Sequence, residues 1–180
     1  MSGESQVSQA PFQRRTFDAL VAGLSPSSPV WEQLRAVGYD PAESRQGWTV
    51  EVFHAAMDVL RRHRFGSLPE SEGYRQLGHA WAEGFAGTPV GEVIAASLRG
   101  ATPEQALRRL VQHVRTARVD AEIHAECVGD RHWRLRLPVE AVPDFNRGLF
   151  EAFLASSAGP GLAVDVDPAF PVPPTLVVRW

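Results

Sequence analysis

Lysine is absent from this sequence, and all 18 basic residues are arginines. The absence excludes every mechanism that depends on a lysine ammonium, including a Walker-type phosphate lysine, a Schiff base and a catalytic amine. Arginine stands at every position where the chain places a basic charge. The sequence therefore holds no lysine-based active site of any class.

Cysteine and long apolar runs are also scarce. The one cysteine, Cys127, excludes an internal disulfide and a zinc site built from several cysteines. The first residues, MSGESQVSQAPFQRR, contain no apolar signal-peptide core, and no run approaches the ~18 apolar residues that a membrane span needs. We expect a cytoplasmic protein without a membrane span, and we expect residues 1–10, which are polar, to be disordered.

Charge of one sign is not concentrated anywhere. The formal net charge is −3, with acidic and basic residues mixed along the chain, so we expect no nucleic-acid partner. Apolar residues make up 44% of the 180 residues, enough for one substantial core. We expect a single domain over residues 11–180, with a helical part over 11–118 and a sheet part over 119–180.

Helical periodicity dominates the first two thirds of the sequence. Thr102, Pro103 and Gln105 form a capping box with proline at the first helical position, and they open the helix that contains LRRLVQHVRTAR. Thr88 and Pro89 begin a shorter helix in the same way. Apolar spacing predicts helices within the segments 12–23, 25–38, 48–66, 74–85, 88–98, 102–118 and 144–159.

Strand-like alternation begins near Asp120. The segments AEIHAECV and HWRLRL both alternate, and a three-residue loop from Gly129 to Arg131 pairs Cys127 with Trp133 and Glu126 with Arg134. Two further strands, LAVDVD and TLVVRW, follow the last helix, with the proline-rich loop 168–174 between them. The predicted class is α+β: an N-terminal helical layer followed by a β-β-α-β-β antiparallel sheet.

No catalytic constellation stands out, so we expect a protein that is not an enzyme. There is no Gly-x-Ser-x-Gly elbow and no His-Glu-x-x-His motif. Asp165 and Asp167 share a strand face but have no third acidic neighbour, so a solvated edge is expected there rather than a metal site. Cys127 lies on the apolar face of its strand, and we expect it to be packed rather than reactive.

His113 lies near the junction between the helix and the first sheet strand. It falls about 60° around the helix from Leu110, which places it beside the buried stripe rather than within it. We expect a partly exposed histidine and no metal ligand.

Several segments resemble one known family. They are LRAVGYD (34–40), YRQLGHAWAEGFAGTPVGEV (74–93), the helix around Gly148 and the terminal VVRW. The family is a paralogous, myxobacteria-restricted group of unknown function and about this length. The resemblance covers roughly residues 12–180, and its motifs are structural, so no activity is implied by it.

In topology the chain is also similar to haem-nitric-oxide-binding (H-NOX) domains, TRAPP subunits and vinyl-reductase-type sensor domains. Members of this group bind haem, acyl chains or aromatic effectors between helices and sheet, and others build protein assemblies. His113 lies close to where the resemblance would place the haem ligand. The Tyr-x-Ser-x-Arg signature of H-NOX domains is absent, and the corresponding strand reads HWRLRLP. We therefore expect no haem and no other cofactor.

These observations favour a regulatory or sensor-like module that binds a small apolar ligand between helices and sheet. The candidate lining residues are Trp81, Phe85, Trp133 and Leu135, which could instead be ordinary core residues. The alternative is a protein-interaction adapter or a homodimeric assembly domain without a ligand. Its candidate surface is the polar face of the hairpin, with Glu126, Arg134 and Arg136.

Overall fold

A computed structural model describes residues 12–117 and 122–180. Within these ranges the chain forms helices and two antiparallel sheets, an α+β arrangement as predicted. The N-terminal elements are β1 (Phe12–Gln13), α1 (Arg14–Leu20), α2 (Val30–Ala36), β2 (Gly47–Trp48), α3 (Val50–Phe65), α4 (Glu70–Ala86), α5 (Pro89–Leu98) and α6 (Pro103–Ala117). The remaining elements are β3 (His124–Gly129), β4 (His132–Arg136), α7 (Pro143–Ala158), a 3-10 turn (Gly159–Gly161), β5 (Ala163–Val166) and β6 (Thr175–Arg179).

Two helices, α5 and α6, begin where their capping residues predict. The side chain of Thr88 accepts a hydrogen bond from the backbone N–H of Gly91 at 3.1 Å and so caps α5. At the start of α6, the Thr102 hydroxyl accepts from the Gln105 N–H while the Gln105 side chain accepts from the Thr102 N–H. This reciprocal pair is the predicted capping box.

The beginning of the described chain differs from the expected helix. Phe12 and Gln13 are extended and pair with Trp48 and Gly47 in a two-stranded antiparallel sheet, so α1 starts only at Arg14. The ring of Phe12 stacks on Phe53 of α3 with centroids 4.1 Å apart. A pairing this short depends on residues more than thirty positions away, and helical periodicity does not reveal it.

Glycine allows α4 and α7 to pack with their backbones in close approach. A Cβ added at Gly148 of α7 would lie 2.0 Å from the carbonyl oxygen of Arg75, and one added at Gly78 of α4 would lie 2.1 Å from that of Phe145. Each of the two glycines thus lies against the backbone of the other helix. The segments around them are those that carry the family resemblance, and the structure gives them a packing role.

The main sheet has the strand order β3-β4-β6-β5, with every neighbouring pair antiparallel. In the hairpin, Cys127 pairs with Trp133 and Glu126 with Arg134, which confirms the predicted register. The predicted three-residue loop is wrong by one residue. A register shift between Cys127 and Gly129 lets Gly129 pair with His132, so the turn itself is only Asp130–Arg131.

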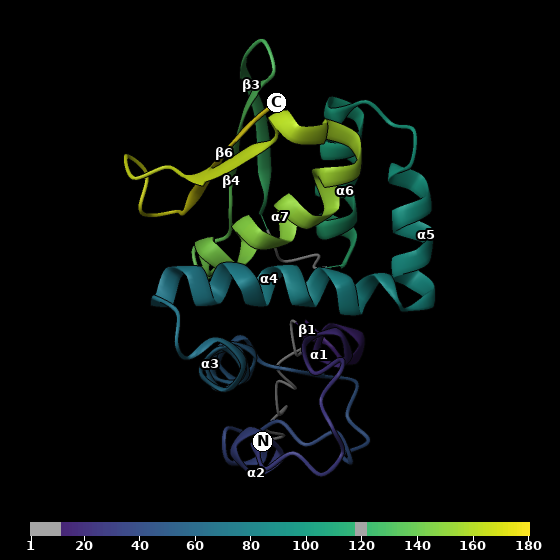
Figure 1. The fold of residues 1–180 in the computed structure, drawn as a ribbon, viewed down its shortest axis with the longest axis vertical. Helices are drawn as coiled ribbons and strands as arrows, with labels where there is room; N and C mark the ends of the chain where they lie inside the picture. The colour runs from purple at the N-terminus through teal and green to yellow at the C-terminus, as the bar shows by residue number, and fades with distance from the viewer. Residues whose placement is uncertain (1–11, 118–121) are drawn as a thin grey trace, which may run out of the picture.

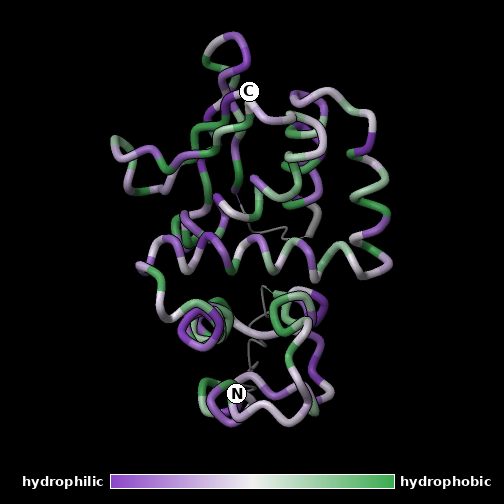
Figure 2. Tube along the Cα trace, in the orientation of Figure 1, coloured by the Kyte–Doolittle hydropathy of each residue, from purple (hydrophilic) through white to green (hydrophobic). Residues whose placement is uncertain are grey.

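The elements form layers around α4 (Figure 1). The helices α1, α2 and α3 lie on one side of α4, and α7 and the main sheet lie on the other. Hydrophobic and hydrophilic residues alternate along α4 in Figure 2, as expected for amphipathic helices. The core runs through both layers, from Phe17, Tyr39 and Trp48 to Phe150, Leu135 and Val178.

Candidate ligand-binding site

An apolar cavity of about 270 Å³ lies among α1, α4, α5, α6 and α7 and is called here the helix cavity. Its walls include Trp81 and Phe85, whose rings stack with centroids 4.9 Å apart and planes 10° from parallel. The Trp81 indole N–H donates to the carbonyl oxygen of Thr16 at 2.9 Å, which fixes the orientation of the ring. The remaining lining residues are Arg15, Val90, Val93, Ile94, Leu110, His113, Val114, Leu149 and Phe153.

A second cavity, of about 140 Å³, adjoins the first and is called here the sheet-side cavity. It lies between α3, α7 and the segments that flank β3 and β4, where Ile123 and Leu137 contribute to its wall. The two cavities have four lining residues in common: Thr16, Trp81, Val114 and Leu149. Trp81 therefore stands at the boundary between two adjacent apolar spaces.

The helix cavity reaches the molecular surface along α5. Val93 is 67% exposed and Val90 is 39% exposed, and both also line the cavity. Because these two exposed side chains also line the cavity, its mouth lies along this stretch of α5.

The four predicted lining residues do not come together in one place. Trp81 and Phe85 share the helix cavity, whereas Leu135 is fully buried in the sheet core and lines neither cavity. Trp133 is buried beneath Arg108, whose guanidinium carbon lies 4.5 Å from the ring centroid. It also borders a hollow at the hairpin together with Cys127 and Trp180. Arg15, Leu149 and Phe153 line the helix cavity and were not anticipated, because their helices converge only in three dimensions.

His113 is half-buried beside the apolar stripe of α6 and lines the helix cavity. Its Nε2 lies 3.3 Å from the Ser97 hydroxyl oxygen, and that hydroxyl donates its hydrogen to the carbonyl oxygen of Ile94. A hydroxyl has a single hydrogen, so the imidazole Nε2–H must be the donor to Ser97. This tautomer leaves no lone pair on Nε2.

The helix cavity beside this histidine is small compared with a haem group. In the tautomer that the Ser97 contact sets, the lone pair of the His113 imidazole is on Nδ1, whereas Nε2 carries the hydrogen donated to Ser97. An apolar cavity of about 150 Å³ holds one benzene ring, so the helix cavity holds roughly two rings, far less than a porphyrin. The stacked rings of Trp81 and Phe85 fill the space beside it.

The predicted partner surface lies on the sheet face away from α7. Arg136 and Glu126 are exposed, and Arg134 is half-buried with its guanidinium carbon 5.0 Å from the centroid of Phe170. Arg134 Nε lies 3.8 Å from an Asp167 carboxylate oxygen, and Asp165 pairs with Arg179. Within residues 12–117 and 122–180, no three His, Cys, Asp or Glu side chains gather as a metal site requires.

The expectation that Cys127 is packed is wrong. Its side chain is exposed, and the sulfur lies 3.3 Å from the carbonyl oxygen of Gly129. Burial falls from Ile123, which is buried just before β3, through Ala125, which is half-buried, to Cys127. The strand is at the edge of the sheet, and its far end extends beyond the helices that cover the inner face.

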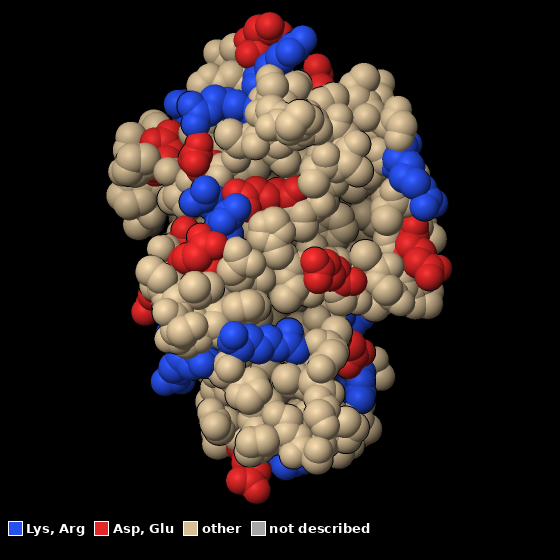
Figure 3. Space-filling model, viewed as in Figure 1, with Lys and Arg blue, Asp and Glu red and all other residues tan. Residues whose placement is uncertain are grey.

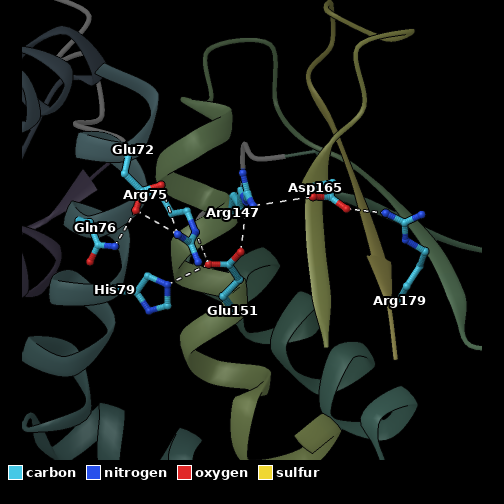
Figure 4. A network of polar contacts seen from close by, with 8 residues as sticks. All are labelled: Glu72, Arg75, Gln76, His79, Arg147, Glu151, Asp165 and Arg179. Atoms are coloured by element: carbon cyan, nitrogen blue, oxygen red, sulfur yellow. Dashed lines mark hydrogen bonds and ion pairs between the residues drawn. The ribbon is translucent and has the colours of Figure 1, made fainter. Parts of the chain in front are cut away.

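A cluster of polar side chains joins α4, α7 and the last two strands (Figure 4). The carboxylate of Glu151 accepts from Arg75 Nε at 2.7 Å and from Arg147 Nε at 3.1 Å, and it lies 2.9 Å from His79 Nε2. Arg147 also lies 3.7 Å from Asp165 on β5. The charges in this cluster pair with one another, so it links the helices to the sheet instead of presenting a reactive group.

Acidic and basic groups are interspersed over the face of the molecule seen in Figure 3, without a large patch of one sign.

None of the helices in the described part of the chain combines the length and apolar character that crossing a bilayer demands.

The arrangement of helices and sheet is similar to that of H-NOX domains of known structure. One structure, from a study probing the function of haem distortion in the H-NOX family, superposes with a TM-score of 0.66 at 13% identity, covering 92% of this chain and 93% of the other. An oxygen-binding H-NOX domain related to soluble guanylate cyclases, in its oxygen complex, gives 0.63 at 13% identity over 92% and 90%. A mutant of the T. tengcongensis H-NOX domain gives 0.56 at 15% identity over 83% and 84%. At these identities the similarity establishes the fold alone.

The chain belongs to the DUF2378 family, a protein family of unknown function, whose model matches residues 11–180. No curated protein matches the chain. The resemblance to a family of unknown function and the H-NOX-like fold are therefore both confirmed, whereas the restriction to myxobacteria stays a prediction.

Proposed function

We propose that this chain is a regulatory, sensor-like module that binds a small apolar molecule in the helix cavity. The observation that carries the proposal is a pair of adjoining apolar cavities with Trp81 at their boundary, one of which reaches the surface beside Val93. Sites for small molecules are typically concave and mostly apolar, with a few polar groups that orient the ligand. Arg15, Thr16 and His113 supply such groups here.

The size of the helix cavity limits the ligand. A volume of about 270 Å³ suits roughly two fused aromatic rings or a short acyl chain, by comparison with the single benzene ring of a 150 Å³ cavity. The adjoining sheet-side space would let a longer ligand extend past Trp81 toward α3 and α7.

We propose binding rather than catalysis as the activity of the chain. The polar side chains around Glu151 are engaged in ion pairs, one of which joins Arg75 of α4 to Glu151 of α7. Cys127, the only thiol, lies on the exposed hairpin and lines neither cavity. Ligand occupancy would instead change how α5 packs against α4 and α6, because α5 forms one wall of the helix cavity.

The test uses indole as a soluble two-ring probe in isothermal titration calorimetry. Val93→Trp places an indole side chain at the cavity mouth, and Glu92→Trp puts the same side chain on a neighbouring exposed position of α5 that does not line the cavity. We expect saturable one-to-one binding to the wild type and to Glu92→Trp, and affinity weaker by about tenfold or more in Val93→Trp. Absence of saturable binding to the wild type, or equal affinity in both variants, would contradict the proposal.

A second candidate function is a protein-interaction adapter or a homodimer, favoured by the position of β3 at the edge of the sheet. An edge strand exposes backbone groups that can pair with another chain. Sedimentation velocity at micromolar concentration tests the homodimer. A concentration-dependent dimer that is lost when a proline replaces Ala125 would support it, and a monomer at every concentration would exclude it.

A further inference from the structure

Arg15 is an unusual residue in the wall of the helix cavity. It is half-buried on α1, and the described part of the chain offers its guanidinium no hydrogen bond or ion pair. The guanidinium of the neighbouring Arg14 makes two hydrogen bonds. Its Nη1 donates to the carbonyl oxygen of Glu43 at 3.0 Å, and its Nη2 donates to that of Pro41 at 2.7 Å. Arg14 thus has a structural role, whereas Arg15 lies beside an apolar space with no ion-pair partner among residues 12–117 and 122–180.

The one fully ionised side chain that lines the helix cavity is the cation Arg15, although the chain as a whole is negative and Glu140 lines the adjoining sheet-side cavity. The protein has 21 acidic and 18 basic residues, yet none of the described residues that line the helix cavity is an aspartate or a glutamate. Its polar lining consists of Arg15, Thr16 and His113. A guanidinium next to a low-dielectric space gains most from an anionic partner, because water cannot screen the interaction fully.

We propose that the ligand of the helix cavity is a small apolar carboxylic acid, bound as its carboxylate, and that Arg15 holds the carboxylate. The inference rests on the proposed function and adds the chemical class of the ligand. The planar guanidinium matches a carboxylate through two parallel N–H donors. A phosphate ester fits less well, because a second negative charge would remain unpaired and would have to be desolvated against apolar walls.

The experiment compares two probes of nearly the same shape, 2-naphthoate and the neutral 2-naphthamide, by calorimetry at pH 7.5. The wild type is expected to bind the carboxylate about tenfold or more tightly than the amide, as for a hydrogen bond to a charged group. Arg15→Met replaces the guanidinium side chain by an unbranched apolar one and so removes the charge. It is expected to bind both probes alike, with unchanged affinity for the amide.

Arg35→Met is the matched control. Arg35 is an exposed arginine on α2, 3.8 Å from Asp40, and it lines neither cavity. It should keep the full preference for the carboxylate. Equal binding of the two probes by the wild type would overturn the ligand class but leave the proposed function standing. A preference that persists in Arg15→Met would overturn the role of Arg15. Failure of both probes to bind the wild type would contradict the proposed function itself.

Discussion

Replacing Gly148 by alanine should destabilise the protein through the contact between α4 and α7. The added Cβ would lie 2.0 Å from the carbonyl oxygen of Arg75, a backbone atom that no rotamer change can move away. An ordinary carbon–oxygen contact is well above 3 Å, so the two helices would have to separate by roughly 1 Å along this stretch. The close packing that the reciprocal Gly78 and Gly148 permit would then be lost.

The size of the effect follows from two opposing contributions. Alanine favours a helix by about 1 kcal/mol relative to glycine, which works against the destabilisation. Overpacking a tight interface costs about 1–3 kcal/mol and sometimes more, and the rigid backbone contact places this site at the upper end. We expect a net loss of about 2 kcal/mol, or a fall in Tm of roughly 4–8 °C for a chain of this size.

Urea unfolding followed by circular dichroism measures the change, with Gly87→Ala as the control. A Cβ at Gly87 would meet its nearest atom at 3.6 Å, an ordinary contact, and its φ of −77° suits any residue. That variant should match or slightly exceed the wild type. If Gly148→Ala is as stable as Gly87→Ala, with the same dependence on urea, the close approach of α4 and α7 is refuted.

Three other predictions concern single side chains. His113→Ala should change the free energy of unfolding by no more than about 1 kcal/mol, and the wild type incubated with hemin should show no Soret band; a stoichiometric band that disappears in His113→Ala would contradict the assignment. Burial, reinforced by the nearby Asp18, raises the pKa of Tyr39 to about 12, so its contribution to stability is complete below pH 10 and is lost as the pH rises through 12. In urea unfolding from pH 8 to 12, the free energy of unfolding of the wild type should fall by about 2–3 kcal/mol more than that of Tyr39→Phe, and identical pH profiles would refute this. Cys127 should react with a thiol reagent in the folded protein as fast as in urea, and protection in the native state would contradict its exposed position.

Local chemistry made much of the architecture predictable. The capping residues Thr88 and Thr102 mark the starts of α5 and α6, and the face alternation of the hairpin gives the pairing of Cys127 with Trp133. These features depend on residues close in sequence, so periodicity and turn chemistry reveal them. The pairing of Phe12 with Trp48 depends on distant residues and was not predictable in this way.

The candidate site was predictable only in part, for a related reason. Trp81 and Phe85 lie one helical turn apart, so their shared position could be inferred from α4 alone. Arg15 and Phe153 join them only because α1 and α7 pack against the same helix. Strand alternation places Trp133 and Leu135 on the inner face correctly, but it cannot distinguish a filled core from a cavity wall.

The central claim is that the helix cavity holds a small molecule, and native mass spectrometry tests it most directly. The freshly purified chain is measured before and after addition of indole, beside Val93→Trp treated in the same way. We predict a one-to-one complex in the wild type, either with a co-purified molecule or with indole, and a much smaller liganded fraction in Val93→Trp at the same indole concentration. The unliganded mass alone in every wild-type sample would contradict it.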